Sequence, residues 1–217
     1  NTDWGDSGHI NHIANSIPGM IYGASLSWNQ DDTRSFEDFD EAVSLIEYGD
    51  RTKKLIGIIR ELSKQDLIIF NSFAFFRDFK TFHLPYHTFG MCLYDNTKKE
   101  IMETDAKLLY TAADKAIVLT DELSAQVLNC RADRGLDMKE YMLSARGLSL
   151  LQQLGLIIKN LEYGQETELI STPKELAVQF EYWLLDYCEV WRKRNKEGEL
   201  FRIKEFVWNI CQILRSY

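Results

Sequence analysis

The feature of this sequence that most constrains its fold is the spacing of its apolar residues, which recur at steps of three and four over long stretches. One stripe runs from residue 108 to 127, and another runs from 142 to 161. This spacing puts the apolar side chains on one face of an α-helix. Proline, which breaks helices, occurs only three times, and no period-2 alternation or internal repeat is visible. We therefore predict an all-α fold, an antiparallel helical bundle with short links.

Capping patterns predict where several of these helices begin. Ser35 is followed three residues later by Asp38, and Thr172 is followed by Pro173 and Glu175. In each pair the hydroxyl oxygen can accept from free amides of the first turn, and the acid can bond back to the cap. Proline suits the first helical position, where its missing N–H costs nothing.

Further boundaries are predicted from weaker signals. Asp137 with Glu140 resembles another capping pair, and Gly49 and Gly198 are expected to end helices. Two more helices are expected over residues 16–29 and, in a region crowded with phenylalanines, over roughly 67–79. We interpret this phenylalanine cluster as core, or as a face covered by another domain.

Composition restricts the possible partners. The chain has 217 residues, of which 45% are hydrophobic, so a sizeable core in one or two domains is expected. Its net charge of −8 argues against a nucleic-acid partner, because phosphates require a basic face, and against an anionic membrane surface. No apolar run reaches the ~20 residues that a membrane span needs.

The cysteines indicate a reducing compartment. Four are present, far apart and without C-x-x-C spacing: Cys92, Cys130, Cys188 and Cys211. We expect buried free thiols and a cytoplasmic protein. We predict no cofactor and no metal. His83 and His87 are four residues apart, but Pro85 between them breaks the helical geometry that a shared metal would need.

Chemistry-bearing residues gather in the first nine positions, Asn1-Thr-Asp-Trp-Gly-Asp-Ser-Gly-His9. Trp4 offers a flat apolar face on which the C–H groups of a sugar can stack, and the Asp6 carboxylate can accept hydrogen bonds from sugar hydroxyls. In an extended backbone these two side chains project to the same side, and Gly5 lets a ligand approach closely. A polar loop with a buried Trp fits the same spacing equally well.

This stretch, followed by Ile17-Pro-Gly-Met-Ile-Tyr-Gly-Ala-Ser-Leu-Ser-Trp28-Asn, resembles the end of the barrel in family-20 glycoside hydrolases, the β-N-acetylhexosaminidases. That family carries a Trp-Gly-Glu motif on the last strand of its barrel, followed by a helix that begins near a Pro and ends in Trp. The resemblance implies that Trp4 lines the pocket for a terminal N-acetylhexosamine. It implies that Asp6, one methylene shorter than the family Glu, contacts the outer hydroxyls O4 or O6. It assigns no role to Asp3 or His9.

The resemblance also implies a domain arrangement. Residues 1–30 are expected to be a remnant of the last strand-helix unit of a (β/α)8 barrel, and residues 31–217 a C-terminal helical domain. Trp191-Arg-Lys-Arg-Asn195 resembles a run near the end of such domains in one bacterial branch of the family. We therefore expect the C-terminal part of a hydrolase that removes terminal N-acetylhexosamine from glycans.

No catalytic residue is expected in this chain, because the family's catalytic Asp–Glu pair lies on an earlier strand. There the Glu protonates the leaving oxygen and the Asp orients the substrate's acetamido nucleophile. Asp121 and Glu122 are adjacent within the helical stripe at 108–127, where successive side chains point ~100° apart, so we interpret them as a solvated helix face. The alternative function is a non-catalytic helical module that binds partners, and the sequence leaves a homodimer open.

Overall fold

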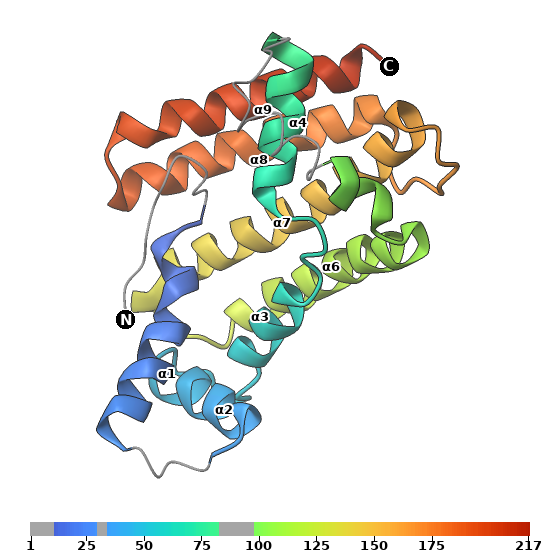
Figure 1. The fold of residues 1–217 in the computed structure, drawn as a ribbon. Helices are drawn as coiled ribbons and strands as arrows, with labels where there is room; N and C mark the ends of the chain where they lie inside the picture. Colours follow the sequence, from blue (N-terminus) through green and yellow to red (C-terminus); the bar gives the residue numbers. More distant parts are fainter. Residues whose placement is uncertain (1–10, 30–33, 83–97) are drawn as a thin grey trace. The chain divides into compact units, whose positions relative to one another are not determined.

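The computed structural model describes residues 11–29, 34–82 and 98–217. Within these ranges every regular element is a helix and no strand is present, which confirms the predicted all-α class (Figure 1). The chain divides into two compact units. Unit 1 comprises Asn1–Lys64 and Ile117–Ala145, and unit 2 comprises Gln65–Ala116 and Arg146–Tyr217. The barrel remnant at residues 1–30 and a boundary at residue 31 stay predictions.

Among its described residues, unit 1 contains three short α-helices, two short 3-10 helices and parts of two long α-helices. Its elements are η1 (Ile13–Ser16), α1 (Ile17–Trp28), α2 (Phe36–Ile46), α3 (Leu55–Ser63), η2 (Ala132–Arg134), the C-terminal part of α6 (Ala106–Val127) and the N-terminal part of α7 (Gly135–Ile157). Its buried core is apolar and aromatic, and includes Phe39, Val43, Tyr48, Leu55, Leu123, Met138 and Tyr141. The helix predicted over 16–29 is confirmed as α1.

Local polar contacts fix the starts of α2 and α3. The Ser35 hydroxyl accepts from the backbone N–H of Asp38, and the Asp38 carboxylate accepts from the backbone N–H of Ser35, which confirms the predicted capping box. Asp50 is fully buried, and its carboxylate accepts from the backbone N–H groups of Thr52, Lys54 and Leu55 at 2.8–3.0 Å. The bonds from Lys54 and Leu55 satisfy amides that the start of α3 leaves open, and the bond from Thr52 holds the turn before it.

The prediction that Asp137 and Glu140 cap a helix start is wrong. The helix α7 begins at Gly135, so both residues lie inside it. Asp137 is 1% exposed and Glu140 is 0% exposed. A capping side chain sits at a helix end beside open amides, whereas these two carboxylates project from within the first turns of α7 into the interior of unit 1.

Unit 2 is built from α4 (Phe70–Phe82), helical residues 98–103, the remaining parts of α6 and α7, the π-helical segment Ile158–Glu162, α8 (Pro173–Arg194), η4 (Glu197–Glu199) and α9 (Leu200–Arg215). The helix expected over 67–79 begins three residues later than predicted and ends at Phe82. Phe73 and Phe76 are buried, as the core interpretation predicts. His83, Pro85, His87 and Cys92 lie outside the described residues.

The helices α8 and α9 lie side by side and antiparallel, drawn in orange and red in Figure 1. The predicted capping box at Thr172 and Glu175 is confirmed, with Pro173 at the first helical position. The basic residues Lys193 and Arg194 lie in the last turn of α8, where cations offset the helix dipole. The helix ends at Arg194 rather than at Gly198, which falls in η4.

The thiol of Cys211 on α9 is fully buried and donates to the carbonyl of Ala177 on α8 at 3.4 Å. Cys188 is also buried, and Cys130 is half-buried; all three are free. The expectation of free thiols therefore holds for these residues, and full burial holds for Cys188 and Cys211.

A buried lysine in unit 2 bonds to backbone carbonyls. Lys159 is 1% exposed and lies in the π-helical segment after α7. Its ammonium donates to the carbonyls of Ile101 at 2.7 Å and Met102 at 2.9 Å. Burial lowers the pKa of Lys159. Both carbonyls lie near the C-terminal end of helical residues 98–103, where the last carbonyls of a helix lack an intrahelical donor. The ammonium bonds to them as a cation near a helix C-terminus does.

Candidate functional site

The two residues predicted to bind the sugar, Trp4 and Asp6, lie outside the described residues, as do Asp3 and His9. Their roles therefore stay predictions. What the structure describes is the segment that follows them, from residue 11 to 16, and the way this segment attaches to unit 1.

Three side chains, those of Tyr48, Glu140 and Tyr141, hold this segment at Ala14. We call these four residues the anchor cluster. The backbone N–H of Ala14 donates to Glu140 Oε2 at 3.0 Å. The Tyr141 hydroxyl donates to the Ala14 carbonyl at 2.8 Å. Both backbone groups of one residue are thus bound by side chains from two successive positions of α7.

The orientation of the two phenols follows from their bonds. The hydroxyls of Tyr48 and Tyr141 are 2.7 Å apart. Because the single Tyr141 proton is directed to Ala14, the Tyr48 hydroxyl must donate to the Tyr141 oxygen. The relay therefore runs in one direction, from Tyr48 through Tyr141 to the Ala14 carbonyl.

Burial keeps this relay neutral. Ala14, Tyr48 and Glu140 are each 0% exposed, and Tyr141 is 2% exposed. Burial raises the pKa of Tyr48 to about 12, and burial, with Tyr48 nearby, raises the pKa of Tyr141 further. Both phenols therefore keep their protons at neutral pH and act as donors. Asn15 adds a 2.7 Å bond from its side-chain amide to the Ser144 hydroxyl, and His12 is also buried.

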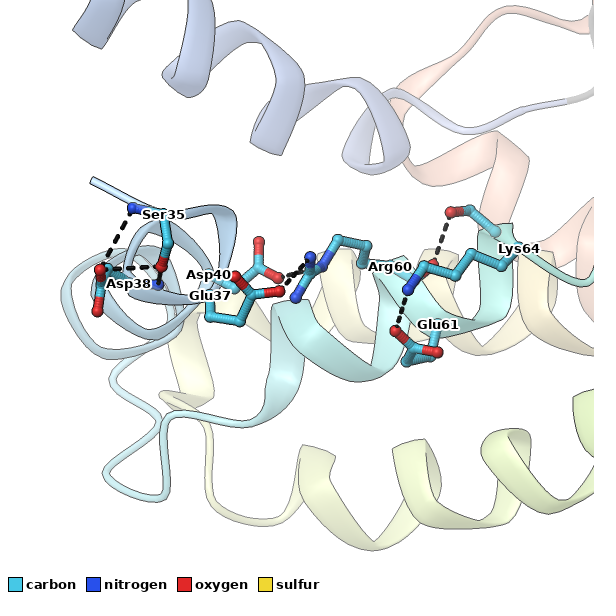
Figure 2. A network of polar contacts seen from close by, with 8 residues as sticks. Ser35, Glu37, Asp38, Asp40, Arg60, Glu61 and Lys64 are labelled. Carbon is cyan, nitrogen blue, oxygen red and sulfur yellow. Dashed lines mark hydrogen bonds and ion pairs between the residues drawn. The ribbon is translucent and has the colours of Figure 1, made fainter. Parts of the chain in front are cut away.

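A charged groove lies elsewhere in unit 1, between α2, α3 and α6. Its volume is about 350 Å³. Its charged lining consists of Glu37, Asp40, Glu41, Lys53, Lys54, Arg60, Glu61 and Glu122. Figure 2 shows Arg60 on α3 reaching towards Glu37 and Asp40 on α2, with Lys64 directed to Glu61.

The charges of this groove mostly neutralise one another. Arg60 Nε lies 2.6 Å from Asp40 Oδ2, and Arg60 Nη1 donates to Glu37 Oε1 at 2.9 Å. Burial raises the pKa of Asp40, and Arg60 opposes that shift. Lys53 pairs with Glu41 at 3.2 Å. A ligand entering the groove would have to displace these pairs, so the groove is better explained as a network that joins α2 to α3 than as a reaction site.

The remaining candidates are resolved by exposure. Asp121 and Glu122 are both exposed on α6, which confirms their interpretation as a solvated helix face, although Glu122 also borders the groove.

In the part of the chain that the structure describes, no group of three or more His, Cys, Asp or Glu could hold a metal ion. None of the described helices has the length and apolar character needed to cross a membrane.

The anchor cluster was not predicted from sequence. Its one local signal, an acid near the start of α7, has the spacing of a capping pair.

Comparison of the chain with protein-family models, with curated proteins and with solved structures finds no match in any of the three.

Proposed function

We propose that this chain contributes a sugar-binding element to a glycoside hydrolase that removes terminal N-acetylhexosamine, and that its own residues bind the sugar without cleaving it. Trp4 stacks on the ring, and Asp6 accepts from its outer hydroxyls. The resemblance of the first nine residues and of residues 17–29 to family-20 enzymes supports this proposal.

The motif resemblance carries the proposal, and one structural observation is compatible with it, the anchoring of Ala14, eight residues after Asp6. Both of its backbone groups are bound in the interior of unit 1. A binding site works only when its residues are held by a rigid support. The anchor cluster gives such a support to residues 11–16, which precede α1.

The acid and the orienting carboxylate of the reaction come, in this proposal, from residues outside the chain. Two features support that view. The adjacent acids Asp121 and Glu122 are exposed on one helix. The buried carboxylate with a raised pKa, Asp40, is held by Arg60 at 2.6 Å. We therefore expect the 217-residue protein to hydrolyse no hexosaminide.

The test is a titration of the 217-residue protein with N-acetylglucosamine and N-acetylgalactosamine, followed by tryptophan fluorescence. Glycerol, which has hydroxyls but no sugar ring to lie against Trp4, is the ligand control and should give no saturable change. We expect a saturable change that Trp4→Ala and Asp6→Ala both abolish without lowering the melting temperature.

Trp28→Ala is the matched control, since Trp28 is 92% exposed at the end of α1 and should leave binding unchanged. An unresponsive wild-type protein, or full binding by both site variants, would contradict the proposal. Loss of folding in Trp4→Ala would favour a structural role for that side chain.

A second candidate function is the non-catalytic helical module that binds partners. It is favoured by one specific observation, a group of exposed apolar side chains on α8 and α9.

A further inference from the structure

An apolar stripe runs along the exposed side of α8 in unit 2. Val178, Tyr182 and Leu185 follow one another at steps of four and three, and they are 45%, 64% and 68% exposed. This spacing places them on one face of the helix. The opposite face of α8, including Phe180 and Trp183, is buried.

The neighbouring helix α9 adds two more apolar side chains. Phe201 and Trp208 are seven residues apart, on one face of α9, and they are 57% and 61% exposed. Trp208 is three residues before Cys211, which contacts Ala177 on α8, so it projects close to the line where the two helices meet. Single exposed apolar residues are normal on a protein, but a group with three aromatic rings is typical of an interaction surface.

The polar residues around the stripe are arranged symmetrically along α8. Glu175 and Lys193 are 18 residues apart in the sequence. That separation is five turns at ~3.6 residues per turn, so both lie on the same face. Gln179 with Glu189, and Tyr182 with Asp186, are centred on the same residue, Leu184. Apart from the half-buried Leu184, all these residues are exposed.

We propose that this face binds a second copy of the chain, with the two α8 helices antiparallel across a twofold axis near Leu184. The axis brings each Glu175 opposite the Lys193 of the other copy. It likewise brings each Gln179, which donates to Ser171 in its own chain, opposite a Glu189. Each Tyr182 hydroxyl comes opposite an Asp186, whose other partner is Arg146 of its own chain. Tyr182 and Leu185 pack at the centre, where an interface is most apolar.

The charge pattern favours a second copy over an unrelated partner. An acid and a base at equal distances from one centre are complemented by an identical helix in the reverse direction, so this chain carries its own complement. The net charge of −8 opposes self-association at long range. At physiological salt this repulsion is screened beyond ~8 Å, whereas contacts within the interface are not.

The first test measures the molar mass of the 217-residue protein by sedimentation equilibrium at physiological salt. We expect a dimer whose dissociation constant rises about tenfold or more in Leu185→Asp, because a central apolar residue is replaced by a charge. Leu128→Asp is the matched control, since Leu128 is 86% exposed in unit 1 and should leave the dimer unchanged.

Charge exchange tests the pairing directly. Lys193→Glu should weaken the dimer, and adding Glu175→Lys in the same chain should restore it. Because Glu175 also belongs to the capping box of α8, Glu175→Gln measures the effect of losing that charge alone. Circular dichroism checks that each variant keeps its helical content.

Cysteine crosslinking tests the antiparallel register without relying on a destabilising variant. Leu185→Cys lies beside the axis and should form a disulfide between copies. Gln179→Cys and Glu189→Cys should crosslink to each other in a mixture more readily than either crosslinks to itself, because each is ~15 Å along the helix from its own counterpart. The wild-type protein measures the background from its own cysteines.

Three results would overturn the proposal. One is a protein that stays monomeric at high concentration. A stripe that binds a different protein while the chain itself stays monomeric counts as the same result. Another is a dimer that Leu185→Asp does not weaken. The third is preferential self-crosslinking of Gln179→Cys and Glu189→Cys, which indicates parallel helices.

Discussion

Replacing Tyr141 by phenylalanine tests whether the anchor cluster holds the segment at residues 11–16. The substitution removes one hydroxyl and leaves the ring, so its edge contact with the Tyr48 ring, at 5.9 Å between centroids, is kept. The Ala14 carbonyl then loses one of its two donors and keeps only the backbone N–H of Ile17. The Tyr48 hydroxyl loses its acceptor at the same time.

The expected loss of stability follows from these two broken bonds. The buried Tyr48 hydroxyl, left without its acceptor, costs about 1–3 kcal/mol, and the hydrogen bond lost at the Ala14 carbonyl costs about 1 kcal/mol more. Tyr141→Phe should therefore lower the free energy of unfolding by about 2–4 kcal/mol, a large fraction of what holds a typical domain together. Urea denaturation followed by circular dichroism measures the change as a shift in the midpoint.

Tyr48→Phe is the matched control for this prediction. In that variant Tyr141 still donates to Ala14, so the loss should be only about 1 kcal/mol. The double variant should lose less than the sum of the two, because their shared bond is removed only once. Hydrogen exchange at the Ala14 amide should accelerate in Tyr141→Phe more than in Tyr48→Phe. If Tyr48→Phe proves as damaging as Tyr141→Phe, the direction of the relay deduced from the geometry is wrong.

Three further outcomes are expected. Folding raises the pKa of Tyr48 from 10.0 to about 12, so the unfolded chain loses this proton first. The free energy of unfolding should therefore fall as pH rises through that interval. In Tyr48→Phe, the urea midpoint should depend less steeply on pH. Thr172→Ala removes the cap of α8 and should cost about 1 kcal/mol in thermal unfolding, whereas Thr172→Ser keeps the hydroxyl and should cost much less; equal losses would refute a capping role. Lys159→Met leaves two carbonyls without their charged donor and should cost about 1.5–3 kcal/mol, and a Met variant as stable as the wild-type protein would show that the ammonium contributes nothing net.

The parts of the fold that the sequence predicted well are those decided by neighbours in the chain. Ser35 and Thr172 cap their helices through residues three positions away, so the pattern and the contact are the same thing. The start of α4 was less accurate, because aromatic residues fill residues 67–79 without marking a boundary.

The anchor cluster could not be predicted in this way. Tyr141 and Ala14 are 127 positions apart in the sequence, and Tyr48 and Tyr141 are 93 apart. Glu140 has the spacing from Asp137 that a capping pair has, and only its burial against Ala14 distinguishes the two roles. For Trp4 and Asp6 the sugar-binding role rests on motif resemblance alone, since no local pattern separates a sugar platform from a buried loop tryptophan.

The position of Cys211 makes its thiol a probe of how often α8 and α9 separate. Burial raises the pKa of its thiol to about 12, so almost none of it is the reactive thiolate at neutral pH. A thiol reagent can reach it only after the two helices have parted and the sulfur has left the carbonyl of Ala177. The rate of modification at Cys211 therefore reports how often this pair opens, on a timescale that an equilibrium melting curve does not resolve.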